Sequence, residues 1–319
     1  MKVTEHYDRA DGPLVSFEII PPRRGSSVED ILGLVHDLVP YSPPFIDVTS
    51  HSAEASYEEM ADGTVRRQTK RKRPGTIGLC AAIQHRFGID AVPHVLCRGF
   101  TREETEDALI ELHYLGIHNV LAITGDDKGC AKADRADRSV NEYSVQLVAQ
   151  IQAMNEGRFL EALLDAAPTN FCIGVGGYPE KHGDAPNKAW DVLNLKRKID
   201  AGADYVVTQM FFDNAHFFDY VERCRAVGIT VPIVPGLKVL TSKKQLHALP
   251  KAFQTEIPEA LAAEVEAAKD EHVADIGVEW ARRQSDELLA AGVPGIHYYL
   301  MQTATHVKRV IEPSLKAVA

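Results

Sequence analysis

The feature that most constrains the fold is a short apolar, β-branched segment that recurs along the chain. Helical patterns lie between successive copies, and such alternation is typical of a parallel sheet covered by helices. Eight repeats favour closure of that sheet into a (β/α)8 barrel over an open doubly wound sheet. The predicted strands cover residues 14–20, 45–50, 92–97, 119–124, 171–176, 204–210, 231–236 and 295–300.

Four segments between these strands have a clear helical pattern and end at glycine, the usual stop residue after a helix. They cover residues 102–116, 188–202, 214–228 and 272–292. We therefore expect one α/β domain over residues 1–319, a (β/α)8 TIM barrel with insertions at 51–91 and 126–142. The pair Asp62-Gly63 predicts a hairpin turn in the first insertion. Both insertions follow carboxyl ends of strands, where barrels carry their active sites.

Composition argues against several classes of function. The net charge of −10 does not favour binding to nucleic acid or to an anionic membrane surface. No apolar run approaches the roughly 20 residues that span a bilayer, and the polar first residues lack the apolar core of a signal peptide. The five cysteines form no CxxC pair, so neither a metal site nor a disulfide framework is expected. A reducing cytoplasm fits this pattern best.

Glu18 stands inside the apolar run "VSFEIIPP", where a charge is costly unless it is paired or used. Strand alternation places Phe17 and Ile19 on one face and Glu18 on the other. The apolar face suits packing under helices, so we expect Glu18 to point into the barrel near the carboxyl end of its strand. Burial would raise its pKa, as a general acid near neutral pH requires. A buried salt bridge or an edge strand remains the alternative.

Other polar residues stand at the ends of predicted strands. His94 is either a ligand contact or a core histidine with a satisfied hydrogen bond. His94 and Cys97 lie three residues apart and point to opposite faces, which argues against a metal pair. Gly125 and Asp126 form either a solvated turn or a place where a ligand approaches the backbone below a carboxylate. Gln209 either caps the barrel or contacts a ligand.

A polar set follows the fifth predicted strand, in "GVGGYPEKHGDAP" and in the next helix. The glycines do not make a dinucleotide fingerprint, but they allow a ligand to lie close to the chain. Helical spacing brings Asp191, Asn194 and Lys198 onto one face, which is either a solvated surface or a binding surface. The whole set is Tyr178, His182, Asp191, Asn194, Arg197 and Lys198.

The segment "RRQTKRKR" (66–73) carries six positive charges in eight residues of an acidic chain. A solvated loop is the ordinary interpretation, and a localisation or nucleic-acid patch is a weaker one. A third hypothesis is that the segment attracts a polyanionic tail on a substrate.

Eight motifs in this order and spacing resemble the methylenetetrahydrofolate reductase family over residues 14–310. They are "SFEIIPPR", "FIDVT", "VPHVLC", "ITGDD", "GYPEKH", "NLKRKIDAGAD", "TQMFFD" and "IVPGL". The resemblance is to the single-domain bacterial form. It implies a barrel that holds FAD at its mouth and uses NADH or NADPH to reduce 5,10-methylenetetrahydrofolate to 5-methyltetrahydrofolate. It also implies a folate substrate, a cytoplasmic place in one-carbon metabolism and methionine biosynthesis, and a homo-oligomer.

The resemblance assigns roles to individual residues. Glu18 matches the general acid that protonates the folate and opens its five-membered ring, and Asp126 matches the acid beside the flavin and the pterin. Gln209 and Gln245 match folate-contacting positions. The positions that match flavin contacts are Thr49, His94, Thr124, Gly125, Asp126, Ser144, Tyr178, His182, Asp191, Asn194, Arg197 and Lys198.

Thr124 departs from the family pattern, which usually has arginine there. The missing guanidinium removes a charge-assisted contact of about 1.5–3 kcal/mol, so we expect a weaker hold on FAD. A flavin-independent reductase, or another pterin-dependent methyl-group enzyme on the same barrel, is the second hypothesis. A binding module without turnover is the third, and Glu18 and Asp126 argue against it.

Overall fold

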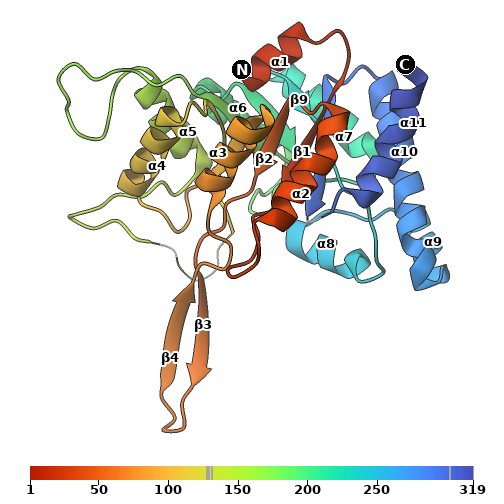
Figure 1. The fold of residues 1–319 in the computed structure, drawn as a ribbon, viewed down its shortest axis with the longest axis horizontal. Helices are drawn as coiled ribbons and strands as arrows, with labels where there is room; N and C mark the ends of the chain where they lie inside the picture. The colour runs from red at the N-terminus through yellow and green to blue at the C-terminus, as the bar shows by residue number, and fades with distance from the viewer. Residues whose placement is uncertain (127–129, 131, 302, 319) are drawn as a thin grey trace.

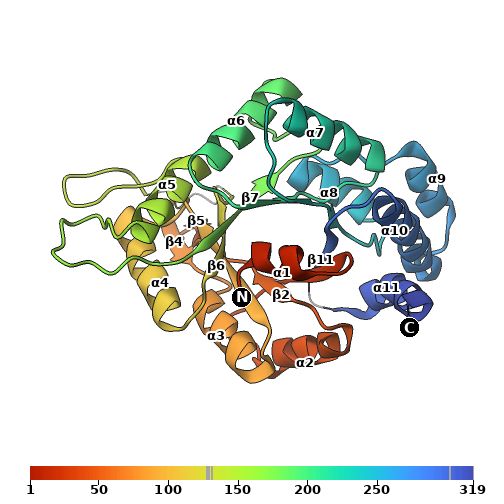
Figure 2. The same ribbon diagram turned by 90° about the horizontal axis from the view of Figure 1, so that it is seen from above.

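A computed structural model describes residues 1–126, 130, 132–301 and 303–318. Within these residues nine strands form one sheet in the order β10-β11-β1-β2-β5-β6-β7-β8-β9, and all its pairings are parallel. Two of the strands, β9 and β10, flank Pro235 and pair with opposite ends of the sheet, so together they close the ring. The predicted (β/α)8 barrel is confirmed, and each of the eight predicted strands lies on it (Figure 2).

The strands of the barrel are β1 (Leu14–Ile19), β2 (Phe45–Val48), β5 (Asp90–Leu96), β6 (Asn119–Ile123), β7 (Cys172–Gly177), β8 (Tyr205–Thr208), β9 (Ile233–Val234), β10 (Gly236–Leu237) and β11 (Gly295–Met301). The helices around them are α2 (Glu29–Leu38), α3 (Thr76–Phe87), α4 (Arg102–Tyr114), α5 (Ser144–Asn155), α6 (Lys188–Asp200), α7 (Asn214–Ala226), α8 (Gln245–Phe253), α9 (Glu259–Ala267), α10 (Val273–Ala290) and α11 (Thr305–Val318). The glycines predicted to stop four of these helices all have positive φ, between 69° and 115°.

Strand alternation divides the core into two layers. Phe17 and Ile19 of β1 are fully buried between the sheet and the helices. Phe45 of β2, Val92 of β5 and Tyr205 of β8 fill the barrel interior instead. The parity expected for β1 is therefore confirmed, and it leaves Glu18 on the interior face.

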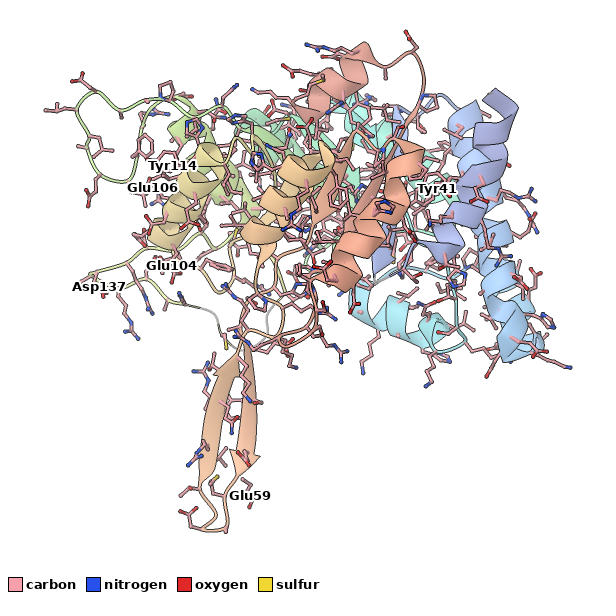
Figure 3. All side chains as sticks on the ribbon, viewed as in Figure 1. Tyr41, Glu59, Glu104, Glu106, Tyr114 and Asp137 are labelled. Carbon is pink, nitrogen blue, oxygen red and sulfur yellow. The ribbon has the colours of Figure 1, made fainter. Side chains whose placement is uncertain are left out.

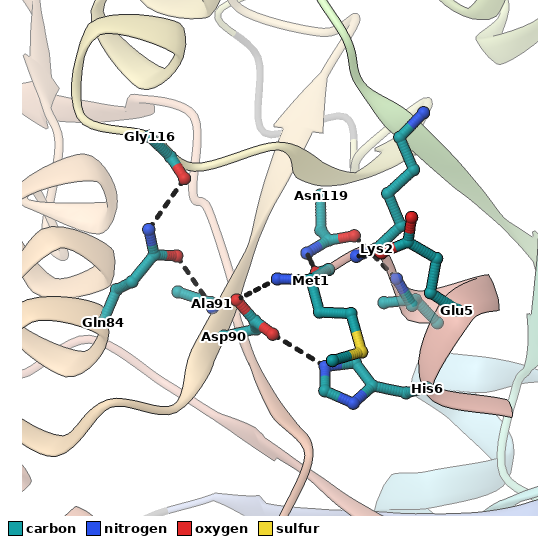
Figure 4. A network of polar contacts seen from close by, with 10 residues as sticks. Met1, Lys2, Glu5, His6, Gln84, Asp90, Ala91, Gly116 and Asn119 are labelled. Atoms are coloured by element: carbon teal, nitrogen blue, oxygen red, sulfur yellow. Dashed lines mark hydrogen bonds and ion pairs between the residues drawn. The ribbon is translucent and has the colours of Figure 1, made fainter. Parts of the chain in front are cut away.

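Helix α1 (Val3–Arg9) covers the amino-terminal end of the barrel, at the centre of the ring in Figure 2. Val3 is fully buried against the interior apolar layer, and its backbone N–H donates to Asn119 Oδ1 at 2.8 Å. His6 Nε2 lies 2.7 Å from Asp90 Oδ2, at the start of β5 (Figure 4). This end of the barrel is packed, and Asp90 and Asn119 have hydrogen-bond partners there, whereas the Tyr205 hydroxyl is buried without one among the described residues.

The segment expected as a first insertion, 51–91, contains two different elements. Strands β3 (Glu54–Glu59) and β4 (Val65–Lys70) form an antiparallel hairpin that extends from the end of the barrel opposite α1 (Figure 1). Its predicted turn is confirmed, because Gly63 has φ 76° and Met60 N–H donates to the Thr64 carbonyl at 2.8 Å. Glu59 lies near the tip (Figure 3). Helix α3 then packs on β5 and β2 as a regular part of the barrel.

The second segment expected as an insertion, 126–142, follows β6. Residues 127–129 and 131 within it lie outside the described part of the chain. The remainder reaches α4, where Arg102 N–H donates to the Ser139 carbonyl at 2.8 Å. It ends in the residues before Ser144, the first residue of α5.

Candidate active site

Glu18 stands near the carboxyl end of β1 and points into the barrel mouth, as its strand parity predicted. Its side chain is 16% exposed. Burial and, to a smaller extent, the charge of Asp47 raise the pKa of this carboxyl, whereas His94 and Lys238 lower it, and the resulting pKa is about 7. A carboxyl with this pKa can hold a proton at neutral pH and release it to a ligand.

Asp47, at the third position of β2, is the neighbour of Glu18 in the sheet register. Its side chain is fully buried, and no described residue makes a hydrogen bond to either of its carboxyl oxygens. Burial raises the pKa of Asp47 to about 7, although His297 opposes the shift. The barrel interior therefore holds a second carboxyl with perturbed acidity beside the first.

His94 of β5 lies between these two carboxyls. Its Nε2 is 3.5 Å from Glu18 Oε2 and 3.6 Å from Asp47 Oδ2. Burial lowers the pKa of His94, and Glu18 opposes that shift. The side chain faces the interior, while Cys97 is buried in the outer layer, so the two do not form a metal pair. Among the described residues, no group of three His, Cys, Asp or Glu side chains could hold a metal ion.

Three further polar side chains complete the mouth. His297 Nδ1 lies 2.9 Å from Ser16 Oγ, deeper in the barrel. Tyr299 donates from its hydroxyl to the Thr208 carbonyl at 2.6 Å. Lys238 follows β10 and is 6% exposed; burial lowers its pKa to about 8, and Glu18 opposes the shift.

A second polar group lies where β7 meets α6. Lys198 Nζ donates to the Gly176 carbonyl at 2.8 Å, and burial lowers the pKa of this amine to about 8. The buried Asp191 accepts from the His182 backbone N–H at 3.1 Å. The Tyr178 and His182 rings meet edge to face, with centroids 4.5 Å apart. The structure thus brings together residues that the sequence separates by 20 positions.

The outer part of the same helix carries Asn194 and Arg197. Arg197 Nη1 donates to Asn194 Oδ1 at 2.9 Å, and the guanidinium lies 5.6 Å from the Trp190 ring centroid. Arg197 is exposed and Asn194 is half-buried. With Lys198 they place two cations and an amide on one helix, a combination that suits a phosphate group.

The loop after β6 carries Thr124, Gly125 and Asp126. Gly125 has φ 81°, a conformation that favours glycine, although a Cβ at this position would make only an ordinary contact with the Leu96 side chain at 3.4 Å. Asp126 is exposed, and its charge raises the pKa of Tyr178, after the larger effect of burial. Asp126 therefore lies on the side of the mouth that carries the α6 group.

Four other predicted residues stand at different places around the mouth. Thr49 follows β2, and its Oγ1 is buried without a hydrogen-bond partner among the described residues. Ser144 begins α5 and is half-buried. Gln209 follows β8, and its Oε1 accepts from the Met210 N–H at 2.9 Å. Gln245 begins α8, and its Oε1 accepts from the Thr241 N–H at 2.6 Å, so its side chain also closes the loop before that helix.

Sequence reasoning missed four residues of the mouth: Asp47, Lys238, His297 and Tyr299. Asp47 carries the same signal as Glu18, a charge inside an apolar run, because Ile46 and Val48 flank it. Strand parity applied to every charged residue in the eight segments would have found Asp47. Lys238 lies two residues beyond the seventh predicted strand, in "VPGLKVL", and would have needed a longer strand to be found.

The basic segment has two different environments. Arg71 and Arg73 hold the base of the hairpin: Arg73 Nη1 donates to the Pro21 carbonyl at 2.6 Å, and the Arg71 guanidinium lies 4.7 Å from the Phe100 ring centroid. Both also line a cavity of about 290 Å³ that reaches His94. Arg66 and Lys70, on the hairpin itself, are exposed.

Comparisons with known proteins identify the family of the chain. The sequence model of the methylenetetrahydrofolate reductase family matches residues 2–314. Methylenetetrahydrofolate reductase 1 of Schizosaccharomyces pombe is 29% identical, over 98% of this chain and 48% of that protein. A 5,10-methylenetetrahydrofolate reductase of Pectobacterium carotovorum is 27% identical, over 91% of this chain and 86% of that protein. The chain thus spans about half the length of its eukaryotic relatives.

One solved structure supports the fold. A Clostridium thermocellum protein, described as binding two copies of 5-methyl-5,6,7,8-tetrahydrofolic acid, matches with a TM-score of 0.61 at 13% identity. The match covers 99% of this chain and 100% of that one. No helix in the described part of this chain is long and apolar enough to cross a membrane.

Proposed function

The chain belongs to the methylenetetrahydrofolate reductase family, and we propose that it reduces 5,10-methylenetetrahydrofolate to 5-methyltetrahydrofolate with a reduced nicotinamide as electron donor. The observation that carries the proposal is Glu18, a buried carboxyl at the barrel mouth with a pKa of about 7. Binding alone does not need such a group, whereas ring opening of a methylene-bridged folate needs a proton at nitrogen.

In this proposal Glu18 supplies that proton. Its carboxyl transfers a proton to a nitrogen of the five-membered folate ring, the carbon–nitrogen bond breaks, and the methylene carbon becomes an electrophilic iminium. The small exposure of Glu18 limits competition from water. Gln209 and Gln245 are proposed to bind the folate, Gln209 from the end of β8 and Gln245 through the part of its amide that does not close the α8 loop.

FAD is the proposed cofactor, and the residues present fit it. Lys198, Arg197 and Asn194 supply donors for its phosphates. Thr49 Oγ1, which has no hydrogen-bond partner among the described residues, and the His94 ring offer polar contacts near the mouth. Gly125 has no side chain that would stand between the backbone and a ligand. The remaining proposed contacts are Thr124, Asp126, Ser144, Tyr178, His182 and Asp191. When bound, FAD would accept a hydride from the nicotinamide and pass it to the folate carbon.

Asp126 is proposed as the acid beside the flavin and the pterin. Its place after β6, close enough to raise the pKa of Tyr178, puts a carboxylate on the side of the mouth opposite the β1 strand that bears Glu18. A carboxylate there can accept hydrogen bonds from the amino group and ring N–H of a pterin. The two acids then have separate tasks, with Glu18 donating a proton and Asp126 orienting the ring.

The proposed electron donor is NADH or NADPH. The relatives include a protein of Arabidopsis thaliana named for NADH, 30% identical over 90% of this chain, and one of Caenorhabditis elegans named for NADPH. We further propose a homo-oligomer that works in the cytoplasm in one-carbon metabolism. It would supply methyl groups for methionine biosynthesis.

An absorbance spectrum of the purified protein, followed by anaerobic addition of each donor and then of methylenetetrahydrofolate, tests the proposal. A flavin spectrum that bleaches with a nicotinamide and returns with the folate is expected. A flavin that neither donor bleaches, or a bleached flavin that the folate does not reoxidise, would overturn it.

A second candidate, a flavin-independent reductase on the same barrel, is favoured by Thr124 alone. The family usually has arginine there, and threonine offers a bound flavin no cation. A colourless protein that reduces the folate with a nicotinamide and no added flavin would establish this candidate instead.

A further inference from the structure

Three titratable side chains from three neighbouring strands meet below the barrel mouth. Glu18 on β1 and Asp47 on β2 are register neighbours. Asp47 is in register with Val92 of β5, and His94 is two residues further along on the same face. The His94 Nε2 atom lies within 3.6 Å of an oxygen of each carboxyl. The backbone register of the barrel therefore fixes this arrangement.

The group has too few hydrogen-bond donors if both carboxyls are ionised. The Nε2 of a neutral imidazole carries at most one proton, so it can serve only one of the two carboxyls at a time. Neither Asp47 oxygen has another hydrogen-bond partner among the described residues. An ionised, unpaired and fully buried carboxylate costs several kcal/mol, so the arrangement favours a second proton within the group.

The groups that face this cluster do not supply the missing hydrogen-bond donors. Lys238 acts on Glu18, and His297 acts on Asp47, but neither makes a hydrogen bond or an ion pair with these carboxyls within the described chain. The titratable or polar groups around the cluster are Tyr7 of α1, Ser16 of β1, Cys80 of α3, Tyr205 of β8, Lys238 after β10, and His297 and Tyr299 of β11.

We propose that Asp47 shares a proton with Glu18 across His94, keeping Glu18 in its acid form and returning a proton to it after each transfer to the substrate. Asp47 is thus a positioning residue for the proton, and the inference rests on the proposed function of Glu18. After Glu18 has lost its proton, the unprotonated Nε2 of neutral His94 takes a proton from Asp47 Oδ2, which makes the ring an imidazolium, and His94 then gives this proton to Glu18 Oε2. The net change moves one proton from Asp47 to Glu18, and solvent restores it between turnovers.

The observed separations of 3.5 and 3.6 Å are slightly longer than hydrogen bonds. Catalytic hydrogen bonds are commonly long without a ligand and tighten when one binds, so a small movement of the imidazole makes each transfer possible. A purely structural Asp47 would instead be expected to accept backbone hydrogen bonds. Asp204, at the other end of the barrel, does this by accepting from the Ile173 N–H at 2.7 Å.

The test compares Asp47→Asn with wild type in the separate half-reactions, followed by flavin absorbance across pH. Because the charge of Asp47 raises the pKa of Glu18, its removal should move the fall of folate reduction to lower pH by about one unit. A shift of that size lowers the rate of folate reduction about tenfold at pH 8 and changes it little near pH 5.5. Reduction of the flavin by the nicotinamide should not change. Asp204→Asn is the matched control and should leave the pH midpoint in place.

A wild-type protein that does not reoxidise its flavin with the folate would reject the proposed function, whatever Asp47 does. An active wild type whose midpoint is unchanged in Asp47→Asn would reject the proton-sharing role alone.

A second measurement needs neither flavin nor folate, and it covers the case in which the variant does not fold. In nitrogen-15 histidine-labelled wild type, with the His94 signal assigned by a His94→Gln variant, Nε2 should respond to a carboxyl titration near pH 7. A His94 signal that stays constant between pH 5.5 and 8.5 would overturn the proposal.

Discussion

The two ends of the barrel interior are built from the same strands but differ in how their polar groups are satisfied. At the amino-terminal end Asp90 pairs with His6, and Asn119 binds the backbone of Val3 (Figure 4). At the carboxyl end Asp47 and His94 Nε2 are buried without hydrogen-bond partners among the described residues. Paired groups stabilise a fold, whereas unpaired buried groups are kept where a ligand uses them. The difference favours the carboxyl end as the place where a ligand binds.

The pKa values follow the same division. Burial alone would raise the pKa of Asp90, but hydrogen bonds from His6 and the amino group of Met1 outweigh it and lower the pKa. Burial is not outweighed at Glu18 or Asp47, whose pKa values rise to about 7. The pKa values of two aspartates on adjacent strands, Asp90 and Asp47, are thus shifted in opposite directions, because only Asp90 has hydrogen-bond partners.

Glu18→Gln should have the largest effect on activity and should not change the packing at the amino-terminal end of the barrel. Loss of the proton donor is expected to slow folate reduction by roughly 10²–10⁴-fold, while flavin reduction by the nicotinamide continues. Stopped-flow absorbance of each half-reaction measures this. Full folate reduction by Glu18→Gln would show that another group supplies the proton.

Phe45→Ala should lower stability but leave the pH dependence of folate reduction unchanged, because Phe45 is fully buried in the apolar layer near α1. Removing a buried aromatic ring is expected to lower the free energy of unfolding by about 3–5 kcal/mol. Urea unfolding measures the change. The folded fraction should keep a normal pH midpoint for folate reduction, and a shifted midpoint would show that the two ends are coupled.

Thr124→Arg should tighten flavin binding, because it restores a guanidinium next to the proposed cofactor site. A charge-assisted hydrogen bond of about 1.5–3 kcal/mol corresponds to roughly 10- to 100-fold in the FAD dissociation constant. Titration of the apoprotein, followed by flavin fluorescence, measures it. Thr124→Lys is the matched control, with the charge but without the planar fork; unchanged affinity in both variants would place the flavin elsewhere.

Stability should depend on pH through Glu18 with a definite sign. Its folded-state pKa is about 7, above the ordinary value for glutamate, so the folded state holds the proton more tightly than the unfolded state. Wild type therefore loses stability as pH rises from about 4 to 7 and loses no more from this source above 7. Glu18→Gln should be more stable than wild type at pH 8, by on the order of 2 kcal/mol, and the difference should vanish near pH 4. Thermal unfolding of both proteins across pH measures this difference. Equal stabilities at pH 8 would contradict the prediction.

Changes in the β3–β4 hairpin should have the smallest effect on stability, because the hairpin lies outside the barrel interior. The double variant Arg66→Glu and Lys70→Glu is expected to change the free energy of unfolding by no more than about 0.5 kcal/mol. If the segment attracts an anionic substrate tail, affinity should fall for folates with several glutamyl residues and not for those with one. Equal affinities for both would leave the hairpin without a role in folate binding.

Strand positions and the direction of Glu18 could be predicted from sequence because both depend on local alternation of side chains. Helix α3 was not recognised, since its sequence "TIGLCAAIQHRF" spreads small and apolar residues around the helix and lies behind a polar hairpin. The position of Arg71 and Arg73 at the base of that hairpin could not be predicted either. It depends on contacts with Pro21 and Phe100, which lie far away in the chain.

The candidate site was predicted in outline but not in its contacts. Asp191 and Lys198 were expected on one helix face, yet their partners, the His182 backbone and the Gly176 carbonyl, come from other elements. The meeting of Glu18, Asp47 and His94 depends on the register between three strands, which short-range patterns do not specify.

Side chains fill the barrel interior and helix α1 covers its amino-terminal end, so ligands can approach Glu18 only from the carboxyl end. If hydride donor and acceptor both reach Glu18 and its surroundings from that opening, they must take turns. The spent nicotinamide then has to leave before the folate can enter. An excess of the nicotinamide would then compete with the folate for the site, and an excess of the folate would compete with the nicotinamide. Turnover should therefore slow at high concentrations of either substrate. A short helix at the far end of the molecule would thus set the order of events at the mouth.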